Sequence, residues 1–149
     1  MIIATLDTNV IVSGIIGYLR ATSTPGALIR HIEDETFRLV ISRHILKEVD
    51  RTLAQAYFTP RLMDIRVRTV RSSLNKRGFF VSITDTVQGI ATHPEDDLVL
   101  ATAVSGNADY LVTGDKGLLS VGTYQGVTIV TPRAFLDILE TPTLPQEPV

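Results

Sequence analysis

The chain has 149 residues, the size of one ordinary domain, which is long enough to bury a core without disulfides. It contains no cysteine, which excludes a disulfide framework and any zinc site built on thiolates. Its formal net charge is −2, so the whole molecule lacks a basic footprint for nucleic acid, and any such contact must come from a local patch or through metal ions.

The first half of the chain predicts alternating strands and helices. Residues 2–6 are apolar and rich in β-branched side chains, which predicts a buried strand, and Asp7-Thr8-Asn9 after them predicts a polar turn. A helix is expected over residues 24–32, with Pro25 at a permitted first position. Residues 37–41 predict a second strand, and Ser42 is a plausible N-cap for the helix that follows it. Four apolar residues of that helix recur at helical spacing and should face the core: Ile45, Leu46, Val49 and Leu53.

The second half continues this alternation. Met63, Val67, Val70 and Leu74 are spaced as on one face of a helix, which should end at Gly78. The remaining expected elements are a strand over 79–83, a helix over 98–103 preceded by an acidic turn at 93–97, strands over 110–113 and 127–130, and a helix over 132–139. Residues 141–149 contain three prolines and are expected to be a disordered tail, which leaves 1–140 as the folded domain.

This alternation predicts an α/β fold, a three-layer α/β/α sandwich around a central, mainly parallel sheet. Sheets of this kind place their sites just beyond the carboxyl ends of the strands. No apolar run approaches the roughly 18–20 residues that cross a bilayer, and Asp7 interrupts the apolar N-terminus, which therefore does not resemble a signal peptide. We expect a cytoplasmic protein without membrane contacts.

Several acids follow strands or open helices. They are Asp7, Glu48, Asp96, Asp97 and Asp115. If the sheet is parallel and sequential, these carboxylates approach one edge, where their repulsion raises their pKa values. Divalent cations relieve such repulsion, and oxygen ligands without cysteine select Mg²⁺ or Mn²⁺. Such an ion can polarise a phosphodiester and activate a bound water.

Each acid taken alone also has an ordinary structural interpretation. Asp7 is compatible with an Asx turn, and Asp115 with a plain turn residue. Glu48 is compatible with the solvated side of an amphipathic helix, and Asp96 or Asp97 with a helix cap. It is the joint pattern that favours a metal site.

Four segments carry a resemblance to a known family. They are Leu6-Asp7-Thr8-Asn9-Val10, residues 42–49 with Glu48, residues 93–103 with the central acids, and residues 108–119 with Thr113-Gly114-Asp115. Each motif is short, but the four occur in order over residues 2–140. The chain resembles PIN domains, and among them the toxin components of bacterial and archaeal toxin–antitoxin pairs.

The resemblance implies a PIN-like nuclease domain over 1–140 that binds Mg²⁺ or Mn²⁺ and cleaves single-stranded RNA. The implied metal-binding and catalytic acids are Asp7, Glu48, Asp96 and Asp115. Asp96 is preferred because Ala101 and Ala103 fix the register, and Asp97 is a reserve ligand. Asn9 and Thr113 are expected to support the site by hydrogen bonding. The implied partners are the RNA substrate, a cognate antitoxin protein and a second copy of the chain in a homodimer.

Two other functions stay open at this point. One is a catalytically inert PIN-like module that binds RNA or protein, and the other is a phospho-receiver-type signalling domain, which also clusters acids at strand ends. Arg61 to Arg77 contains six cations opposed only by Asp64, which is compatible with phosphate contacts or with a solvated helix surface. His31 and His44 are expected to be structural or surface residues.

Overall fold

The structure, a computed structural model, describes residues 1–55, 65–84, 87–91 and 93–141. Six strands form one sheet in the order β3-β2-β1-β4-β6-β5. All neighbouring pairs are parallel except β5 and β6. The strands are β1 (Ile3–Leu6), β2 (Arg38–Ile41), β3 (Phe79–Phe80), β4 (Tyr110–Val112), β5 (Thr123–Tyr124) and β6 (Val127–Val130). The expected α/β class with a mainly parallel central sheet is confirmed.

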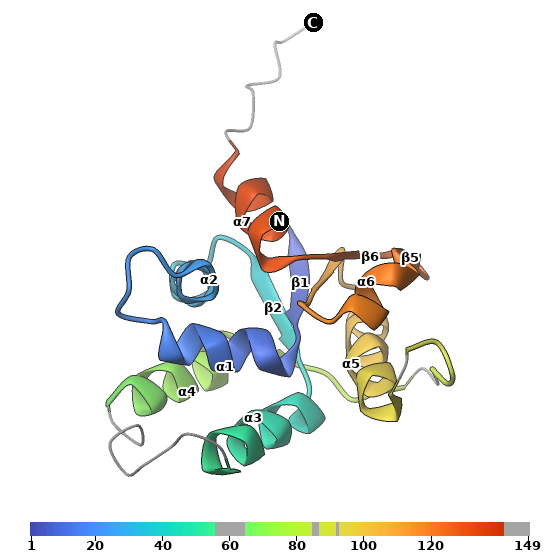
Figure 1. The fold of residues 1–149 in the computed structure, drawn as a ribbon, viewed down its shortest axis with the longest axis horizontal. Coiled ribbons are helices and arrows are strands. Elements are labelled where there is room, and N and C mark those ends of the chain that lie inside the picture. The colour runs from blue at the N-terminus through green and yellow to red at the C-terminus, as the bar shows by residue number, and fades with distance from the viewer. Residues whose placement is uncertain (56–64, 85–86, 92, 142–149) are drawn as a thin grey trace, which may run out of the picture.

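Helices flank this sheet, as Figure 1 shows. The helices are α1 (Thr8–Ile16), α2 (Thr24–Glu33), α3 (Arg43–Gln55), α4 (Ile65–Arg77), α5 (Pro94–Ser105), α6 (Lys116–Val121) and α7 (Pro132–Glu140). Helices α1, α2 and α4 pack together on one side of β1 and β2, and α5 lies on the other side (Figure 1). Helix α3 contacts both α1 and α5, so it bridges the two layers.

The strand order places a topological switch between β1 and β4. From β1 the chain builds the sheet outward through β2 and β3 in one direction, and β4 and β6 extend it in the other. The register of β1 and β4 pairs Leu6 with Val112. Asp7 and Thr113 therefore leave the sheet side by side at its carboxyl edge, where open α/β sheets bind their ligands.

The core is aliphatic with a small aromatic cluster. Phe135 of α7 is fully buried and meets Phe37 edge-to-face, with 5.1 Å between ring centroids. The apolar positions expected for α3 are buried, as are Val67, Val70 and Leu74 of α4. These three positions of the α4 stripe are thus covered by the chain's own core.

The expected polar turn after β1 is wrong, because α1 begins at Thr8. Val10, Ile11, Val12 and Ile15 are all buried in this nine-residue helix. Its run of β-branched residues disfavours a helix by intrinsic propensity, but burial between β1 and the neighbouring helices outweighs that preference. Asp7 occupies the N-cap position, although its side chain makes no capping hydrogen bond.

Other boundaries also differ from expectation. The strand expected over 79–83 is limited to Phe79–Phe80, and α5 begins at Pro94 rather than at residue 98. Helix α6 and strand β5 are additional to the expected elements. Arg61, Met63 and the tail over 142–149 lie outside the described residues. Within the described ranges, no helix has the length and apolar character to span a membrane.

Asp97 joins α5 to the loop before it. One carboxylate oxygen accepts a hydrogen bond from the Gly89 backbone N–H at 3.0 Å, and the other accepts from Ile90 at 3.2 Å and Ala91 at 2.7 Å. The Asp97 residue is only 6% exposed. Because an ionised carboxylate is a strong acceptor, this one side chain fixes three successive backbone donors.

We therefore expect Asp97→Ala to lower the free energy of unfolding by about 2 kcal/mol, since backbone donors lose a charged acceptor. Asp97→Asn, which keeps one carbonyl acceptor, should lose less. Urea unfolding measures both. Asp137→Ala is the control, because Asp137 is 61% exposed on its side chain in a surface ion pair with Arg133. An Asp97→Ala protein as stable as the control would contradict this role.

Candidate active site

The site begins where β1 and β4 end. Thr113 Oγ1 donates a hydrogen bond of 2.7 Å to Asp7 Oδ2, and the same hydroxyl accepts one of 3.0 Å from the Asp115 backbone N–H. Asp7 is 5% exposed and Thr113 is fully buried. The Thr113 hydroxyl thus fixes the direction of the Asp7 carboxylate and the position of Asp115 at once.

Asp115 is the N-cap of α6. Its Oδ2 accepts a hydrogen bond of 2.8 Å from the Leu118 backbone N–H, which orients the carboxylate. Asp115 lies close enough to raise the pKa values of both Asp7 and Asp96 by charge repulsion. The acid after β4 is therefore part of the same electrostatic group as the acid after β1.

Glu48 approaches from α3. Its Oε2 accepts a hydrogen bond of 3.1 Å from Thr8 Oγ1 at the start of α1. Its Oε1 lies 3.3 Å from His44 Nε2, one turn earlier on α3, but both of these buried atoms lack a hydrogen bond within the described part of the chain. Burial raises the pKa of Glu48, His44 lowers it and Glu95 raises it further. Glu48 therefore keeps one oxygen unsatisfied at the edge of the site.

The charges of the other three acids all raise the pKa of Asp96. Partial burial at the start of α5 is the main cause that raises its pKa, from the usual 3.8 to about 6. Repulsion from Asp7, Asp115 and Glu48 adds to this effect, while His93 opposes it. All four expected acids are thus within electrostatic reach of one point.

Burial also raises the pKa of Asp7, and the Asp115 charge raises it further. The hydrogen bond from Thr113 and the backbone at Thr8 oppose this shift. An acid whose pKa is raised by burial and by like charges gains when a cation arrives, because the cation removes both penalties.

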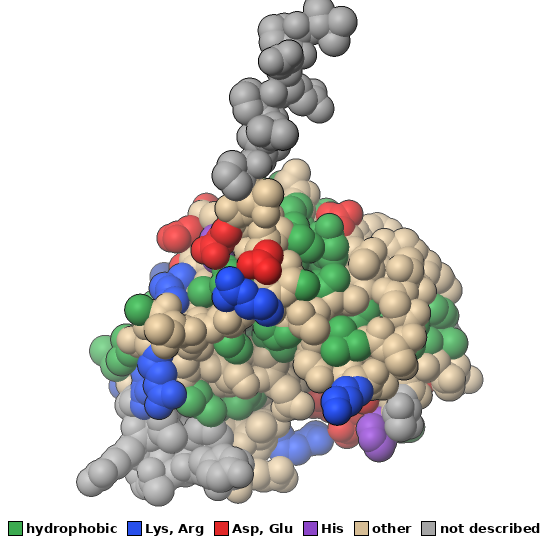
Figure 2. Space-filling model, turned by 45° about the horizontal axis from the view of Figure 1, so that its top comes forward, with side chains coloured by type: hydrophobic (Ala, Val, Ile, Leu, Met, Phe, Trp, Pro, Cys, Tyr) green, Lys and Arg blue, Asp and Glu red, His purple; other side chains and the backbone are tan. Residues whose placement is uncertain are grey.

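Three of these acids, Asp7, Glu48 and Asp96, line an open cleft of about 430 Å³, and Asp115 is not part of its lining. The residues that line it are Asp7, Thr8, Asn9, Glu48, Arg51, Thr52, Gln55, Glu95 and Asp96. In Figure 2, acidic side chains gather with a histidine and cationic side chains at the lower edge of the molecule, the end where Figure 1 places α3 and α5. Arg51 is the single Lys or Arg among these residues.

Arg51 is held only loosely. Its Nη1 lies 3.9 Å from Glu95 Oε1, and the two side chains are 59% and 65% exposed. An exposed ion pair of this length contributes little to stability, so Arg51 is available to another anion that enters the cleft.

The donor set fits a hard divalent cation in its chemistry. Asp7, Glu48, Asp96 and Asp115 offer carboxylate oxygens, and Glu48 Oε1 is buried without a hydrogen bond. Over the described residues, however, no three His, Asp or Glu side chains are drawn together tightly enough to hold an ion as they stand. Side-chain rotation toward a common centre would be needed to bind an ion there.

The structure gives several residues roles that the sequence did not indicate. Asp97, the expected reserve ligand, binds backbone N–H groups of the loop with both of its oxygens, which favours a structural role over a metal-binding one. The sequence predicts a structural or surface role for His44. In the structure its side chain lies beside Glu48, one of the acids of the site. Thr8, Arg51 and Glu95 were missed. A signal for Arg51 existed in its position one turn after Glu48 on a helix. Asn9 is exposed and lines the cleft.

Comparison with known proteins identifies the family of the chain. A family model described as a PIN domain matches residues 4–117, well over half of the chain. The fold of the present chain is similar to that of a chain in the crystal structure of VapBC2 from Rickettsia felis bound to a DNA fragment from their promoter. The TM-score is 0.53 and the sequence identity is 14%. The similarity covers 87% of this chain and 98% of that one. No curated protein sequence matches. The chain belongs to the PIN domain family.

Proposed function

We propose that this protein is a metal-dependent endoribonuclease that hydrolyses phosphodiester bonds of single-stranded RNA and acts as the toxin of a toxin–antitoxin pair. The observation that carries the proposal is the placement of the acids at the carboxyl edge of the sheet, where Thr113 bonds both Asp7 and Asp115 and where Asp7, Glu48 and Asp96 line one cleft. Burial and the charges of Asp7, Asp115 and Glu48 raise the pKa of Asp96 to about 6, which agrees with this placement. A fold that gathers four acids at the carboxyl edge of its sheet maintains a cost that cation binding relieves.

Each residue of the site has a distinct part in the proposed reaction. Asp7, Glu48, Asp96 and Asp115 would hold Mg²⁺ or Mn²⁺, and Thr113 keeps the Asp7 carboxylate directed toward the cleft. The bound ion would supply Lewis-acid polarisation of the phosphodiester and a water of lowered pKa. Arg51 would bind a non-bridging phosphate oxygen through its guanidinium and so position the scissile bond over the acids.

The toxin role rests on the family and on the similar fold. The solved structure with the similar fold is VapBC2 from Rickettsia felis bound to a DNA fragment from their promoter. By analogy, we propose a cognate antitoxin protein as a partner and a cytoplasmic location. The homodimer that the resemblance implies stays a prediction.

Two alternative functions were left open by the sequence, and RNA cleavage distinguishes the one that remains. Membership of the PIN family decides against the phospho-receiver interpretation. The inert binding module differs from the nuclease in cleavage alone. Incubation of a labelled unstructured RNA with the protein in Mn²⁺, with and without EDTA, tests the proposal: new 5′-phosphate ends only with Mn²⁺ support it, and intact RNA under both conditions favours the inert module.

The first expected outcome concerns the acids. Asp7→Asn and Asp96→Asn should each reduce Mn²⁺-dependent cleavage by several orders of magnitude, because each removes a charged ligand while preserving the shape of the side chain. Asp97 is unsuitable as a control, since its replacement disturbs the 89–91 loop. Asp137→Asn, on the exposed side of α7, is the matched control and should cleave at the wild-type rate. Wild-type cleavage by Asp96→Asn would overturn the assignment of the site.

A second outcome concerns Arg51. Arg51→Ala should raise KM for RNA by roughly tenfold to a hundredfold, the range expected when a charge-assisted hydrogen bond to phosphate is removed, with a smaller change in kcat. The KM of Arg51→Lys should lie between those of wild type and Arg51→Ala, since lysine keeps the charge but not the planar guanidinium group. The Mn²⁺-dependent rise in melting temperature should be unchanged in both variants. An unchanged KM in Arg51→Ala would remove Arg51 from the proposed site.

The third outcome links pH to stability. A raised folded-state pKa means that the stability due to Asp96 is present below pH 3.8 and is lost as pH rises through about 6. In EDTA, Asp96→Asn should therefore match wild type near pH 4 and melt at a higher temperature near pH 7. Millimolar Mn²⁺ should raise the wild-type melting temperature at pH 7 more than at pH 5, and that of Asp96→Asn only slightly. If wild type and Asp96→Asn had equal melting curves in EDTA at pH 7, the destabilisation assigned to the ionised Asp96 carboxylate would be contradicted.

A further inference from the structure

Helix α4 concentrates positive charge in a chain whose net charge is −2. In 13 residues it carries no acid and five cations, namely Arg66, Arg68, Arg71, Lys76 and Arg77. Its buried face is Val67, Val70 and Leu74, so the cations lie on the sides and the outer face of the helix. A solvated helix would normally mix both signs of charge, and α4 does not.

Neighbouring acids neutralise only part of this charge. Arg71 Nε lies 2.9 Å from Asp50 Oδ1 of α3, and Arg77 Nη1 lies 2.8 Å from Glu35 Oε1. Glu33, at the end of α2, accepts hydrogen bonds from the hydroxyls of Tyr18 and Ser73. Within the described residues, Arg68 and Lys76 have no ion-pair partner, and both are exposed.

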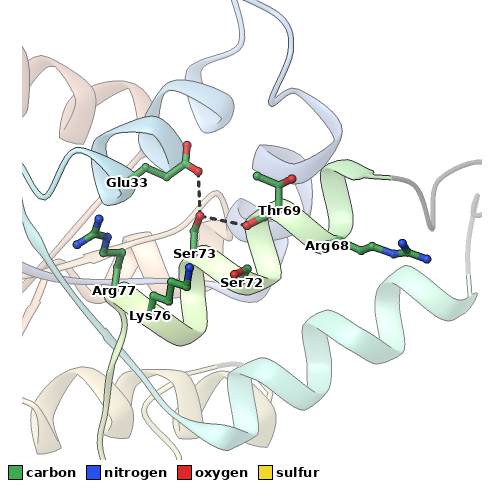
Figure 3. A pocket seen from close by; sticks show the side chains of 7 residues that line it. All are labelled: Glu33, Arg68, Thr69, Ser72, Ser73, Lys76 and Arg77. Carbon is green, nitrogen blue, oxygen red and sulfur yellow. Dashed lines mark hydrogen bonds between the residues drawn. The ribbon is translucent and has the colours of Figure 1, made fainter.

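These two cations border a shallow hollow of about 470 Å³ on the outer side of α4. Figure 3 shows Arg68 and Lys76 toward opposite ends of the helix, with the hydroxyls of Thr69, Ser72 and Ser73 between them. The two cations are eight positions apart, which corresponds to about 12 Å along an α-helix. Glu33 and Arg77 complete the lining, and no aliphatic or aromatic side chain contributes to it.

We propose that this surface, formed by Arg68, Thr69, Ser72 and Lys76, binds the sugar–phosphate backbone of single-stranded RNA. The proposal rests on the proposed ribonuclease function for the identity of the nucleic acid. Two cations with small hydroxyl donors between them match a row of phosphates, while the lack of an apolar centre disfavours a protein partner. Without an aromatic platform, the binding is independent of base sequence.

The surface is connected to the cleft through α3. The Arg71–Asp50 ion pair links α4 to α3, which also carries Glu48 and Arg51. An RNA strand that lies on α4 is therefore bound beside the helix that lines the acidic cleft. This arrangement offsets the repulsion between the acids and the phosphates of the substrate with binding energy gained away from the reacting bond.

The test is RNA binding as a function of salt. Binding of fluorescein-labelled oligouridylate is measured by anisotropy in EDTA for the full chain and for the Arg68→Ala/Lys76→Ala variant. The variant should bind about tenfold more weakly at low salt, and the slope of log K against log salt should fall by about 0.7 for each phosphate that the protein no longer neutralises. Arg133→Glu on α7 is the control, because it changes the net charge by the same two units at an exposed position. It should bind RNA as wild type does.

Two results would overturn the proposal: a double variant with wild-type affinity and slope, or an equal weakening of binding in Arg133→Glu. Thermal unfolding checks that both variants are folded, as expected for exposed side chains. Cleavage with Mn²⁺ separates this inference from the proposed function. If wild type does not cleave RNA but the double variant loses salt-dependent binding, the surface stands and the nuclease proposal fails. If wild type cleaves and the double variant binds normally, the nuclease stands and the surface fails.

Discussion

The pairing of β1 with β4 is the constraint on which the rest of the site depends. It places Leu6 opposite Val112. The residues that follow them are Asp7 and Thr113, and the Thr113 hydroxyl donates a hydrogen bond of 2.7 Å to the Asp7 carboxylate. A shift of one residue in either strand would reverse which side chains face the core and separate these two groups. The acid that follows β4 and the helix that follows β1 are both positioned from this one hydrogen bond.

Burial and repulsion at this edge act against stability. Asp7 is only 5% exposed, and three of the four acids have pKa values raised chiefly by burial. A protein selected for stability alone would place neutral side chains there. The hydrogen bonds from Thr113 to Asp7, from Thr8 to Glu48 and from the backbone to Asp115 limit this cost without neutralising the charges. The arrangement keeps the acids ionisable, which is the property that cation binding requires.

Sequence patterns predicted the features that depend on local periodicity. The buried positions of α3 and α4, and the strands that carry Asp7 and Asp115 at their ends, follow from spacing and from turn residues. Helix α1 could not be predicted from its Val10-Ile11-Val12 run, because only tertiary burial makes those residues helical. Glu95 could not be assigned to the cleft, because its proximity to Arg51 depends on how α3 packs against α5, which no local pattern encodes.

Asp96 and Asp97 show how adjacent carboxylates take different roles on one helix. Successive residues of an α-helix are about 100° apart, so only one of the two can face the cleft. Asp97 is directed into the protein, where three backbone N–H groups of residues 89–91 use both of its oxygens. Asp96 is left facing Asp7 and Glu48, where burial is the main cause that raises its pKa and the neighbouring charges raise it further. By fixing the first turn of α5 to the preceding loop, Asp97 also fixes the rotation of the helix about its axis. That rotation directs Asp96 toward the other acids, so the structural carboxylate determines where the proposed catalytic one lies.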